Sequence, residues 1–207
     1  NKIITGSSGG MFLTNSKEDA DKVRKWSTQS REVAPWYQHE EMGYNYRMSN
    51  VIAGVVRGQI PHLEEHIAQK KAIYYRYKEG LKGLPVDMNP FDEVNSVPNY
   101  WLSCLLIRPE GMCFQERGDT VPTYTTEPGK SCPTEILDTL AKYNAEGRPI
   151  WKPMHMQPIY KDNPFVSANE TDVSMDIFTR GLCLPSDNKM TPEEQDVIID
   201  MIRACFE

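Results

Sequence analysis

GYNYRMSN, residues 43–50, separates two very different stretches of this sequence. Before it, REVAPWYQHEEM at 31–42 has no sustained hydrophobic period, so we expect a surface loop. After it, apolar residues recur three or four positions apart from Ile52 to Leu81, which is typical of helix. Pro61 would interrupt one long helix, so the pattern predicts two helices, with Pro61 in the first turn of the second.

Residues 1–30 predict a strand that passes into a helix. The glycine turn TGSSGG at 5–10 is followed by the apolar run MFLT at 11–14, which we expect to be a short strand. KEDADKVRKWSTQ at 17–29 is typical of helix, with Ser16 placed to cap it. The chain begins with Asn inside a motif, and we interpret this start as a cut edge.

Strands and helices alternate along the rest of the sequence, which predicts an α/β or α+β domain. The segment at 111–130 is polar and broken, and we expect an insertion or a lid-like loop. The other expected elements are a buried strand at 100–107, a helix at 132–147 that stops at Gly147, a strand-like element at 148–158, a helix at 172–180, a strand at 181–186 and a last helix opened by Thr191, Pro192 and Glu194.

Composition excludes several classes of protein. The 207 residues are 39% hydrophobic and carry a net charge of -6, which gives no basic surface for nucleic acid. The longest apolar runs are too short to span a membrane. The five cysteines form no CxxC pair, so neither a disulfide framework nor a zinc site is predicted. We therefore expect a cytoplasmic protein with reduced thiols and with no nucleic-acid or membrane partner.

Three stretches resemble a known family: NKIITGSSGGM at 1–11, TQSRE at 28–32 with GYNYRMSN at 43–50, and RPIWKPMHMQPIY at 148–160. They resemble segments of the DegT-type (DegT/DnrJ/StrS) pyridoxal-phosphate-dependent nucleotide-sugar aminotransferases. The third is similar to the RPLWKPMHLQP signature of the subgroup that acts on UDP-linked 4-keto-6-deoxy-N-acetylhexosamines. The resemblance covers nearly the whole chain apart from the segment near 111–130.

The resemblance implies the α/β fold-type I of these aminotransferases, with this chain as its carboxyl-terminal half. Residues 1–48 would end the cofactor-binding large domain and include a dimer-crossing loop. Residues 49–83 would be connecting helices, and 84–207 a small α+β domain. The missing half would supply most cofactor contacts, so we expect activity of the full-length parent and not of this fragment.

The resemblance also implies roles for five residues. Lys2 would be catalytic and would bind pyridoxal phosphate through its amine. Asn45 would bind the cofactor phosphate across the dimer, and Arg31, Arg47 and His155 would contact the substrate. The structural alternatives are a solvated lysine, an Asx turn at the asparagine, arginines in surface ion pairs and a packed strand histidine.

Other candidate residues carry weaker signals. TGSSGG departs from the commonest family wording, TTGEGG, so neither serine of that turn is given a role. Trp151 is expected in the core. His62 and His66 share a helix face, but HLEEH lacks the HExxH order and a third ligand, so no metal site is predicted.

The implied reaction transfers an amino group, with glutamate as the donor, to the 4-keto group of a nucleotide-linked 6-deoxy sugar. A homodimer would perform it in surface-glycan or glycoprotein sugar biosynthesis. One alternative is a non-catalytic fragment or interaction module of the same fold. Another is a sugar dehydratase of this family, in which histidine replaces the lysine, and Lys2 argues against it.

Overall fold

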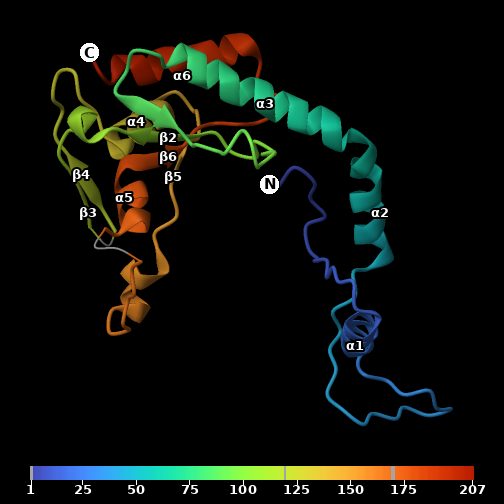
Figure 1. Ribbon diagram of the computed structural model, residues 1–207. Coiled ribbons are helices and arrows are strands. Elements are labelled where there is room, and N and C mark those ends of the chain that lie inside the picture. Colours follow the sequence, from blue (N-terminus) through green and yellow to red (C-terminus); the bar gives the residue numbers. More distant parts are fainter. Residues whose placement is uncertain (1, 119, 169–170) are drawn as a thin grey trace. The chain divides into compact units, whose positions relative to one another are not determined.

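The computed structural model describes residues 2–118, 120–168 and 171–207, which form two compact units, 1–65 and 66–207 (Figure 1). The boundary between the units falls inside the predicted connecting helices, and the domain limits expected from the sequence stay a prediction. Asn1, interpreted as a cut edge, lies outside the described residues. Among those residues, no helix combines the length and the apolar character that crossing a membrane requires.

The first unit is built on capped helices. In α1 (Lys17–Ser27), the Ser16 hydroxyl accepts a hydrogen bond from the Asp19 amide, as the sequence predicts. Ser49 caps α2 (Asn50–Gln59) in the same way. The loop at 31–42 is also confirmed, since most of its residues are exposed and no named strand or helix includes them.

Pro61 divides the long helical pattern, as predicted. It lies in a 3-10 turn, η1 (Ile60–His62), after which α3 (Leu63–Gly80) begins. Proline has no amide hydrogen to donate, so the regular helix resumes only two residues later. Pro61 therefore occupies the turn between the helices and not the first turn of α3.

The strand predicted at 11–14 is wrong. The structure has irregular backbone there, with Met11 80% and Leu13 82% exposed. A strand requires a neighbour that supplies ladder hydrogen bonds, and the described residues of the first unit contain only isolated bridges.

The second unit contains a four-stranded antiparallel sheet in the order β1 (Val86–Met88), β2 (Cys104–Ile107), β6 (Gly181–Cys183) and β5 (Arg148–Pro149). Alternate residues of β2, Leu105 and Ile107, are buried in the hydrophobic core. The strand is shorter than predicted, because Tyr100 has a left-handed backbone (φ 53°), which strands do not accommodate.

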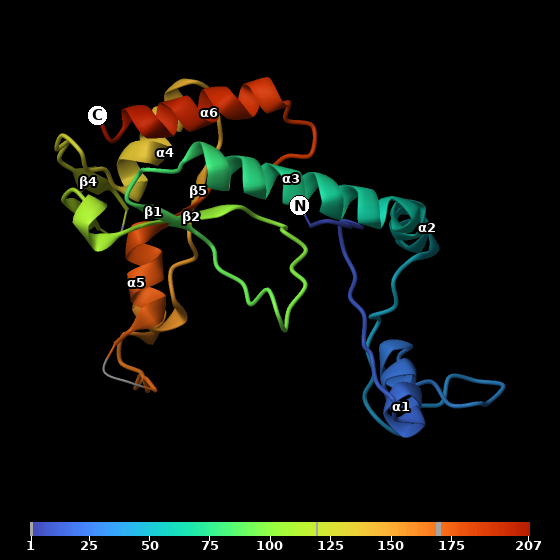
Figure 2. The same cartoon turned by 45° about the horizontal axis from the view of Figure 1, so that its top comes forward.

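Helices cover both faces of this sheet. Figure 2 shows α4 (Pro133–Lys142) and α6 (Pro192–Ala204) on one side and α5 (Val173–Arg180) on the other. The predicted capping box of α6 is present between Thr191 and Glu194. The core between sheet and helices consists of apolar side chains, namely Ile73, Tyr77, Leu81, Val86, Leu105, Ile107, Ile136, Leu140, Leu182, Leu184, Ile198, Ile199, Ile202 and Phe206.

The segment predicted as an irregular loop at 111–130 contains a hairpin, β3 (Gln115–Arg117) with β4 (Pro122–Tyr124). Two contacts anchor it to neighbouring helices: the Gln115 side-chain amide donates to the Thr179 carbonyl (2.6 Å), and its oxygen accepts from the Thr134 hydroxyl (2.8 Å). Asp119 lies outside the described residues. Because these tertiary contacts hold the hairpin, its strands can form without a clear hydrophobic period in the sequence.

Helix α4 ends five residues before the predicted stop at Gly147. Its last residue is Lys142, and Asn144 takes the left-handed conformation (φ 59°) common after a helix end. Gly147 serves another purpose, since a Cβ there would lie 2.8 Å from Leu137 Cδ2. Glycine at position 147 therefore lets the chain pack closely against α4.

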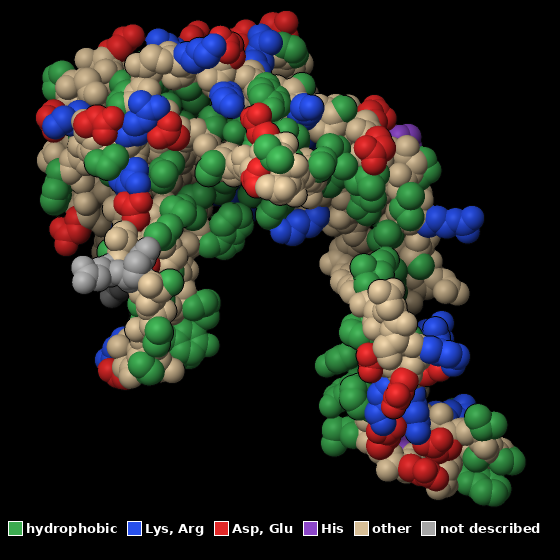
Figure 3. Space-filling model, viewed as in Figure 1, with side chains coloured by type: hydrophobic (Ala, Val, Ile, Leu, Met, Phe, Trp, Pro, Cys, Tyr) green, Lys and Arg blue, Asp and Glu red, His purple; other side chains and the backbone are tan. Residues whose placement is uncertain are grey.

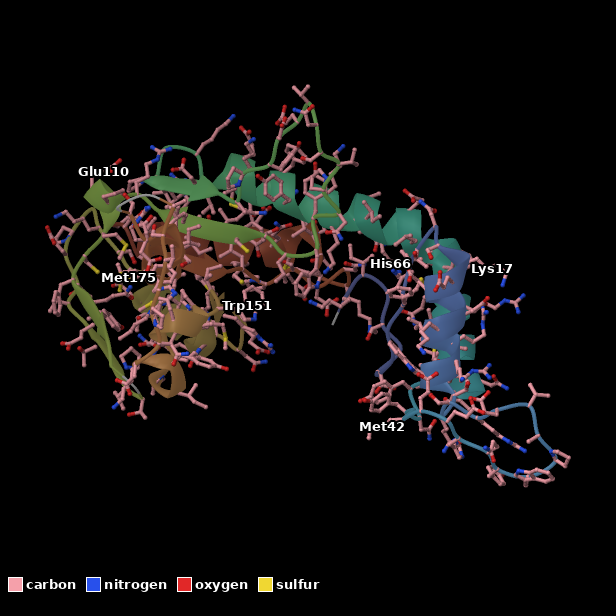
Figure 4. The ribbon with its side chains drawn as sticks, turned by 60° about the horizontal axis from the view of Figure 1, so that its bottom comes forward. Lys17, Met42, His66, Glu110, Trp151 and Met175 are labelled. Carbon is pink, nitrogen blue, oxygen red and sulfur yellow. The ribbon has the colours of Figure 1, made fainter. Side chains whose placement is uncertain are left out.

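The strand-like element predicted at 148–158 is mostly wrong. Only the two residues of β5 pair, and 3-10 turns follow, η3 (Met154–Met156) and η4 (Pro158–Tyr160). Prolines at 149, 153 and 158 explain this, because each removes a ladder donor. Trp151 is 64% exposed and not in the core (Figure 4). Its ring lies 6.2 Å from that of Trp101.

Candidate functional site

Lys2 is exposed and precedes a glycine-containing segment that lies against α2. The Thr5 amide donates to Gln59 Oε1 (3.1 Å), and Gln59 Nε2 donates to the Thr5 carbonyl (2.6 Å). A Cβ at Gly6 would lie 2.6 Å from Val56 Cγ2, so glycine allows the close approach. The stretch after Lys2 is thus fixed to a helix.

Asn45 lies beside the carboxyl-terminal end of α1. It forms an antiparallel bridge with Thr28. On either side, the Tyr44 amide donates to the Trp26 carbonyl (2.6 Å) and the Tyr46 amide to the Ser27 carbonyl (3.0 Å). The backbone around Asn45 is therefore held by main-chain bonds, and its amide side chain is exposed.

Gly43 is required where the two arms of the loop meet. A Cβ there would lie 2.2 Å from the Gln29 carbonyl carbon, and a backbone atom cannot move away easily to relieve this clash. Ser30, fully buried, donates its hydroxyl to the Met42 carbonyl (3.0 Å) on the opposite arm. The glycine of GYNYRMSN therefore closes the base of the loop, which we call the crossing loop (residues 28–47).

Arg31 and Arg47 are both exposed on the crossing loop. The guanidinium of Arg31 lies 4.3 Å from the ring centroid of Tyr37, a cation–π contact. Within the described ranges, neither arginine pairs with a carboxylate, so the surface ion-pair interpretation gains no support. Both guanidiniums can accept an anionic ligand.

A charged network connects the crossing loop to α1. Glu41 contacts Lys22 (2.7 Å), Lys25 (3.2 Å) and the Trp26 indole nitrogen (3.1 Å). Hydrogen bonds from Lys22, then Trp26 and Lys25, lower the pKa of Glu41 to about 2. At the other end of the loop, hydrophobic side chains gather at its tip, where Val33, Trp36 and Tyr37 are exposed (Figure 3).

His155 lies in the second unit, in η3, and is oriented from two sides. Its Nε2 is 2.6 Å from Asp172 Oδ2, and its ring stacks on Phe165 with centroids 3.8 Å apart. Asp172 also caps α5, accepting from the Met175 amide (2.9 Å) and the Ser174 hydroxyl (2.8 Å). The Met175 amide is the main reason that the pKa of Asp172 lies below its ordinary value, and His155 contributes.

The structure therefore places four of the five predicted site residues, Lys2, Arg31, Asn45 and Arg47, in the first unit and His155 in the second. Sequence reasoning did not select Asp172 or Phe165. An aspartate ahead of a helical pattern signals a cap. Its contact with a histidine 17 positions away carries no local signal.

Residues 1–203 match the DegT/DnrJ/EryC1/StrS aminotransferase family. The chain belongs to this family. EpsN of Bacillus subtilis (strain 168), provisionally named a pyridoxal phosphate-dependent aminotransferase, is 38% identical over the whole chain and 48% of its own length. GDP-perosamine synthase of Escherichia coli O157:H7 is 27% identical over the whole chain and 50% of its own length. The chain thus spans about half the length of these curated relatives.

Solved structures of other aminotransferases share the fold. TlmJ from Streptoalloteichus hindustanus superposes with a TM-score of 0.76 at 16% identity, over 98% of this chain and 49% of TlmJ. PseC of Helicobacter pylori gives 0.72 at 16% identity, over 93% of this chain and 47% of PseC. The predicted α/β fold-type I is confirmed. The predicted cofactor is confirmed at the level of the family, in which EpsN is named pyridoxal phosphate-dependent and Spr1654 of Streptococcus pneumoniae has solved PLP and PMP forms.

The polar groups of the first unit have the chemistry that such a cofactor requires. Lys2 offers a primary amine that can attack an aldehyde. Asn45 offers a neutral amide and Arg31 and Arg47 offer guanidiniums, and both groups donate hydrogen bonds to phosphate. This DegT-family chain therefore contains, in one compact unit, a primary amine and several groups that can donate hydrogen bonds to phosphate.

Proposed function

We propose that the protein that contains this chain is a pyridoxal-phosphate-dependent aminotransferase of a nucleotide-linked 4-keto-6-deoxy sugar. Glutamate is the proposed amino donor, and a UDP-linked N-acetylhexosamine the proposed sugar class. The observation that carries the proposal is the first unit, in which the segment after Lys2 is fixed to α2 while the crossing loop presents Asn45.

Each residue has a distinct proposed task. Pyridoxal phosphate, when bound, supplies the electron sink that lets an amino group be transferred. Lys2 binds the cofactor through its amine and later moves a proton to or from the sugar C4 atom. Asn45 donates to the cofactor phosphate, and Arg31 and Arg47 hold substrate anions in two-bonded contacts.

His155 is the proposed substrate residue of the second unit. Its imidazole can donate to a sugar or diphosphate oxygen. Asp172 and Phe165 support this role, because a side chain held on its edge and on its face loses little freedom when it binds a ligand. These two contacts support a binding role for His155 more strongly than its position in the sequence does.

The proposed active form is a homodimer, in which Asn45 and Arg47 complete the site of the neighbouring subunit. The exposed apolar tip of the crossing loop supports this, because exposed aromatic side chains are typical of protein contact surfaces. A two-fold interface is expected. We also propose that the 207-residue chain alone is inactive, and that the reaction belongs to surface-glycan or glycoprotein sugar biosynthesis in the cytoplasm.

Substitution of Lys2 tests the proposal. In the complete protein, Lys2→Ala should lower amino transfer from glutamate to the keto sugar by a factor of about 10² to 10⁴ or more, because the proton carrier is lost. Lys17→Ala, which removes an exposed lysine from α1, should leave the rate unchanged. Formation of the amino sugar is followed by mass spectrometry.

Mixing inactive variants tests the shared site. If Asn45 acts across the dimer, a mixture of Lys2→Ala and Asn45→Ala subunits should recover part of the activity that each variant lacks. Full activity of Lys2→Ala would refute the assignment of the lysine. No recovery in mixed dimers would refute the crossing role of Asn45 while leaving the lysine assignment intact.

A further inference from the structure

Two cysteines face each other across the central strands of the sheet in the second unit. Cys104 of β2 is directly opposite Cys183 of β6 in the antiparallel register. Their sulfur atoms are 3.7 Å apart. Both thiols are free in the structure. Their separation is short enough that a small rotation of the side chains brings the sulfurs into bonding contact.

The backbone position of the pair suits a disulfide. The Cys104 amide and carbonyl bond to Asn89, on the β1 side, at 2.9 Å each. The Leu184 amide bonds to the Ser103 carbonyl, so Cys104 and Cys183 occupy a non-hydrogen-bonded position of the β2–β6 ladder. Cα atoms at such positions lie about 4.5 Å apart. This falls within the range of about 4.4–6.8 Å that disulfides span.

The two sulfurs differ in their electrostatic surroundings. A hydrogen bond from Cys104 lowers the pKa of Cys183, the charge of Arg148 adds to this, and burial opposes it. The same hydrogen bond and burial raise the pKa of Cys104. Arg148 is opposite Cys183 in the β5–β6 register. Because Arg148 lies on the strand next to Cys183, its positive charge favours a thiolate at Cys183, and we expect Cys183 to be the nucleophile of the pair.

We propose that Cys104 and Cys183 form an oxidation site at which hydrogen peroxide produces an intramolecular disulfide. The Cys183 thiolate attacks one peroxide oxygen, the O–O bond breaks, and hydroxide leaves as water after taking a proton. The Cys183 sulfenic acid is then attacked by the Cys104 sulfur. The S–O bond breaks, the Cys104 proton leaves with that oxygen as water, and the two thiols have lost two electrons to the peroxide.

We expect peroxide to reach the pair at Cys104 or by local opening at the edge of the sheet. Cys104 is half-buried and Cys183 is buried, and β5, the strand beyond Cys183, has only two residues. Short edge strands open locally at small free-energy cost. The disulfide joins strands that are already neighbours, so the fold can keep it. A disulfide at this position remains open to reduction by thiols such as dithiothreitol.

A second cysteine pair in the same unit provides an internal comparison. The sulfurs of Cys113 and Cys132 and a carboxylate oxygen of Glu135 lie within 4.8 Å of one another. Burial is the main cause that raises the pKa of both thiols, that of Cys113 to about 12. With both sulfurs protonated, this pair should react with peroxide more slowly than Cys104 and Cys183.

Peptide mapping tests the proposal without any variant. The purified protein is treated with hydrogen peroxide, its remaining thiols are alkylated, and peptides are mapped by mass spectrometry under non-reducing conditions. The expected first product is a link between the Cys104 and Cys183 peptides that dithiothreitol reverses. If both cysteines remain alkylatable, or if Cys113 and Cys132 link first, the proposal is wrong.

Variants assign the two roles. In Cys104→Ser, peroxide should leave a sulfenic acid at Cys183 that dimedone traps, because the second sulfur is missing. In Cys183→Ser, no sulfenic acid should form at Cys104. Cys205→Ser is the matched control and should form the disulfide at the wild-type rate, since Cys205 lies at the end of α6. Trapping at Cys104 and not at Cys183 would overturn the order of attack.

Discussion

Asp172 determines how His155 can act. The carboxylate faces Nε2 of the imidazole and can accept a hydrogen bond from it, so Nδ1 lies on the opposite edge of the ring. In the neutral ring Nδ1 accepts a hydrogen bond, and in the imidazolium it donates one. Nδ1 can therefore contact a sugar hydroxyl or a phosphate oxygen of a substrate. Phe165 covers one face of the ring and keeps it in this orientation.

Asp172 can be tested apart from its role as a helix cap. In Asp172→Asn the side-chain oxygen still accepts from the Met175 amide, so α5 keeps its cap while His155 loses its anionic partner. We expect KM for the nucleotide sugar to rise and kcat to change little. His155→Ala should lower kcat/KM roughly 10- to 150-fold, the loss of one charged hydrogen bond.

Ser174→Ala is the control for this prediction, since Ser174 contacts Asp172 but not His155. Its KM should match that of the wild-type protein. Circular dichroism shows whether α5 is retained in each variant. An unchanged KM in His155→Ala would exclude a substrate contact, whatever the behaviour of Asp172→Asn.

The site residues could be selected from the sequence only through the resemblance, because each alone has a common structural explanation. Asn45 illustrates the limit. Its place beside α1 depends on main-chain bonds from Tyr44 and Tyr46 and on the close approach at Gly43, none of which the motif reveals. Asp172 went unselected because a contact between distant residues has no sequence spacing.

At the level of elements, the ion network between α1 and the crossing loop gives a pH-dependent prediction. Glu41 has a folded pKa of about 2, below its ordinary value of 4.5. A depressed carboxyl pKa means that the network's contribution to stability is fully present above about pH 4.5 and is lost as the pH falls toward 2. The indole N–H of Trp26 donates a hydrogen bond to Glu41, so its NMR resonance reports the ionisation of the carboxyl group.

We expect the indole resonance to titrate with a midpoint near pH 2 in the wild-type protein. In Glu41→Gln this transition should be absent, because glutamine does not ionise. Glu40→Gln removes a neighbouring exposed carboxyl and should leave the transition unchanged. A wild-type midpoint near 4.5 would show that the contacts with the lysines do not lower the pKa of Glu41 in solution.

Sequence signals predicted the elements that depend on local chemistry. The caps of α1 and α6 and the break at Pro61 need only a few adjacent residues, and all three are present. The strand at 11–14 was mispredicted because the described residues of the first unit contain no strand to pair with it. The hairpin β3–β4 was missed because anchors such as Thr179 lie elsewhere in the chain. Trp151 was mispredicted because hydrophobicity alone does not place a side chain inside.

At the scale of the whole chain, burial is unevenly divided between the two units. Every buried hydrophobic residue of the described chain belongs to the second unit, from Ile73 to Phe206. In the first unit, α1 and α2 have no buried residue, and Ser30 is buried. Because apolar burial is the main source of folding free energy, the second unit should hold most of the stability of this chain.

Hydrogen exchange of the 207-residue chain measures this difference. Amides of β2, β6, α4 and α6 should exchange slowly, at rates set by global unfolding, while those of α1 and α2 should exchange close to the rate of unstructured chain. Ile202→Ala, at a fully buried position of α6, should speed exchange in the first group by lowering stability about 2–5 kcal/mol. It should leave α1 unaffected, because the amides of α1 exchange by local opening. Equal protection of α1 and β2 would show that the first unit has a core of its own in solution.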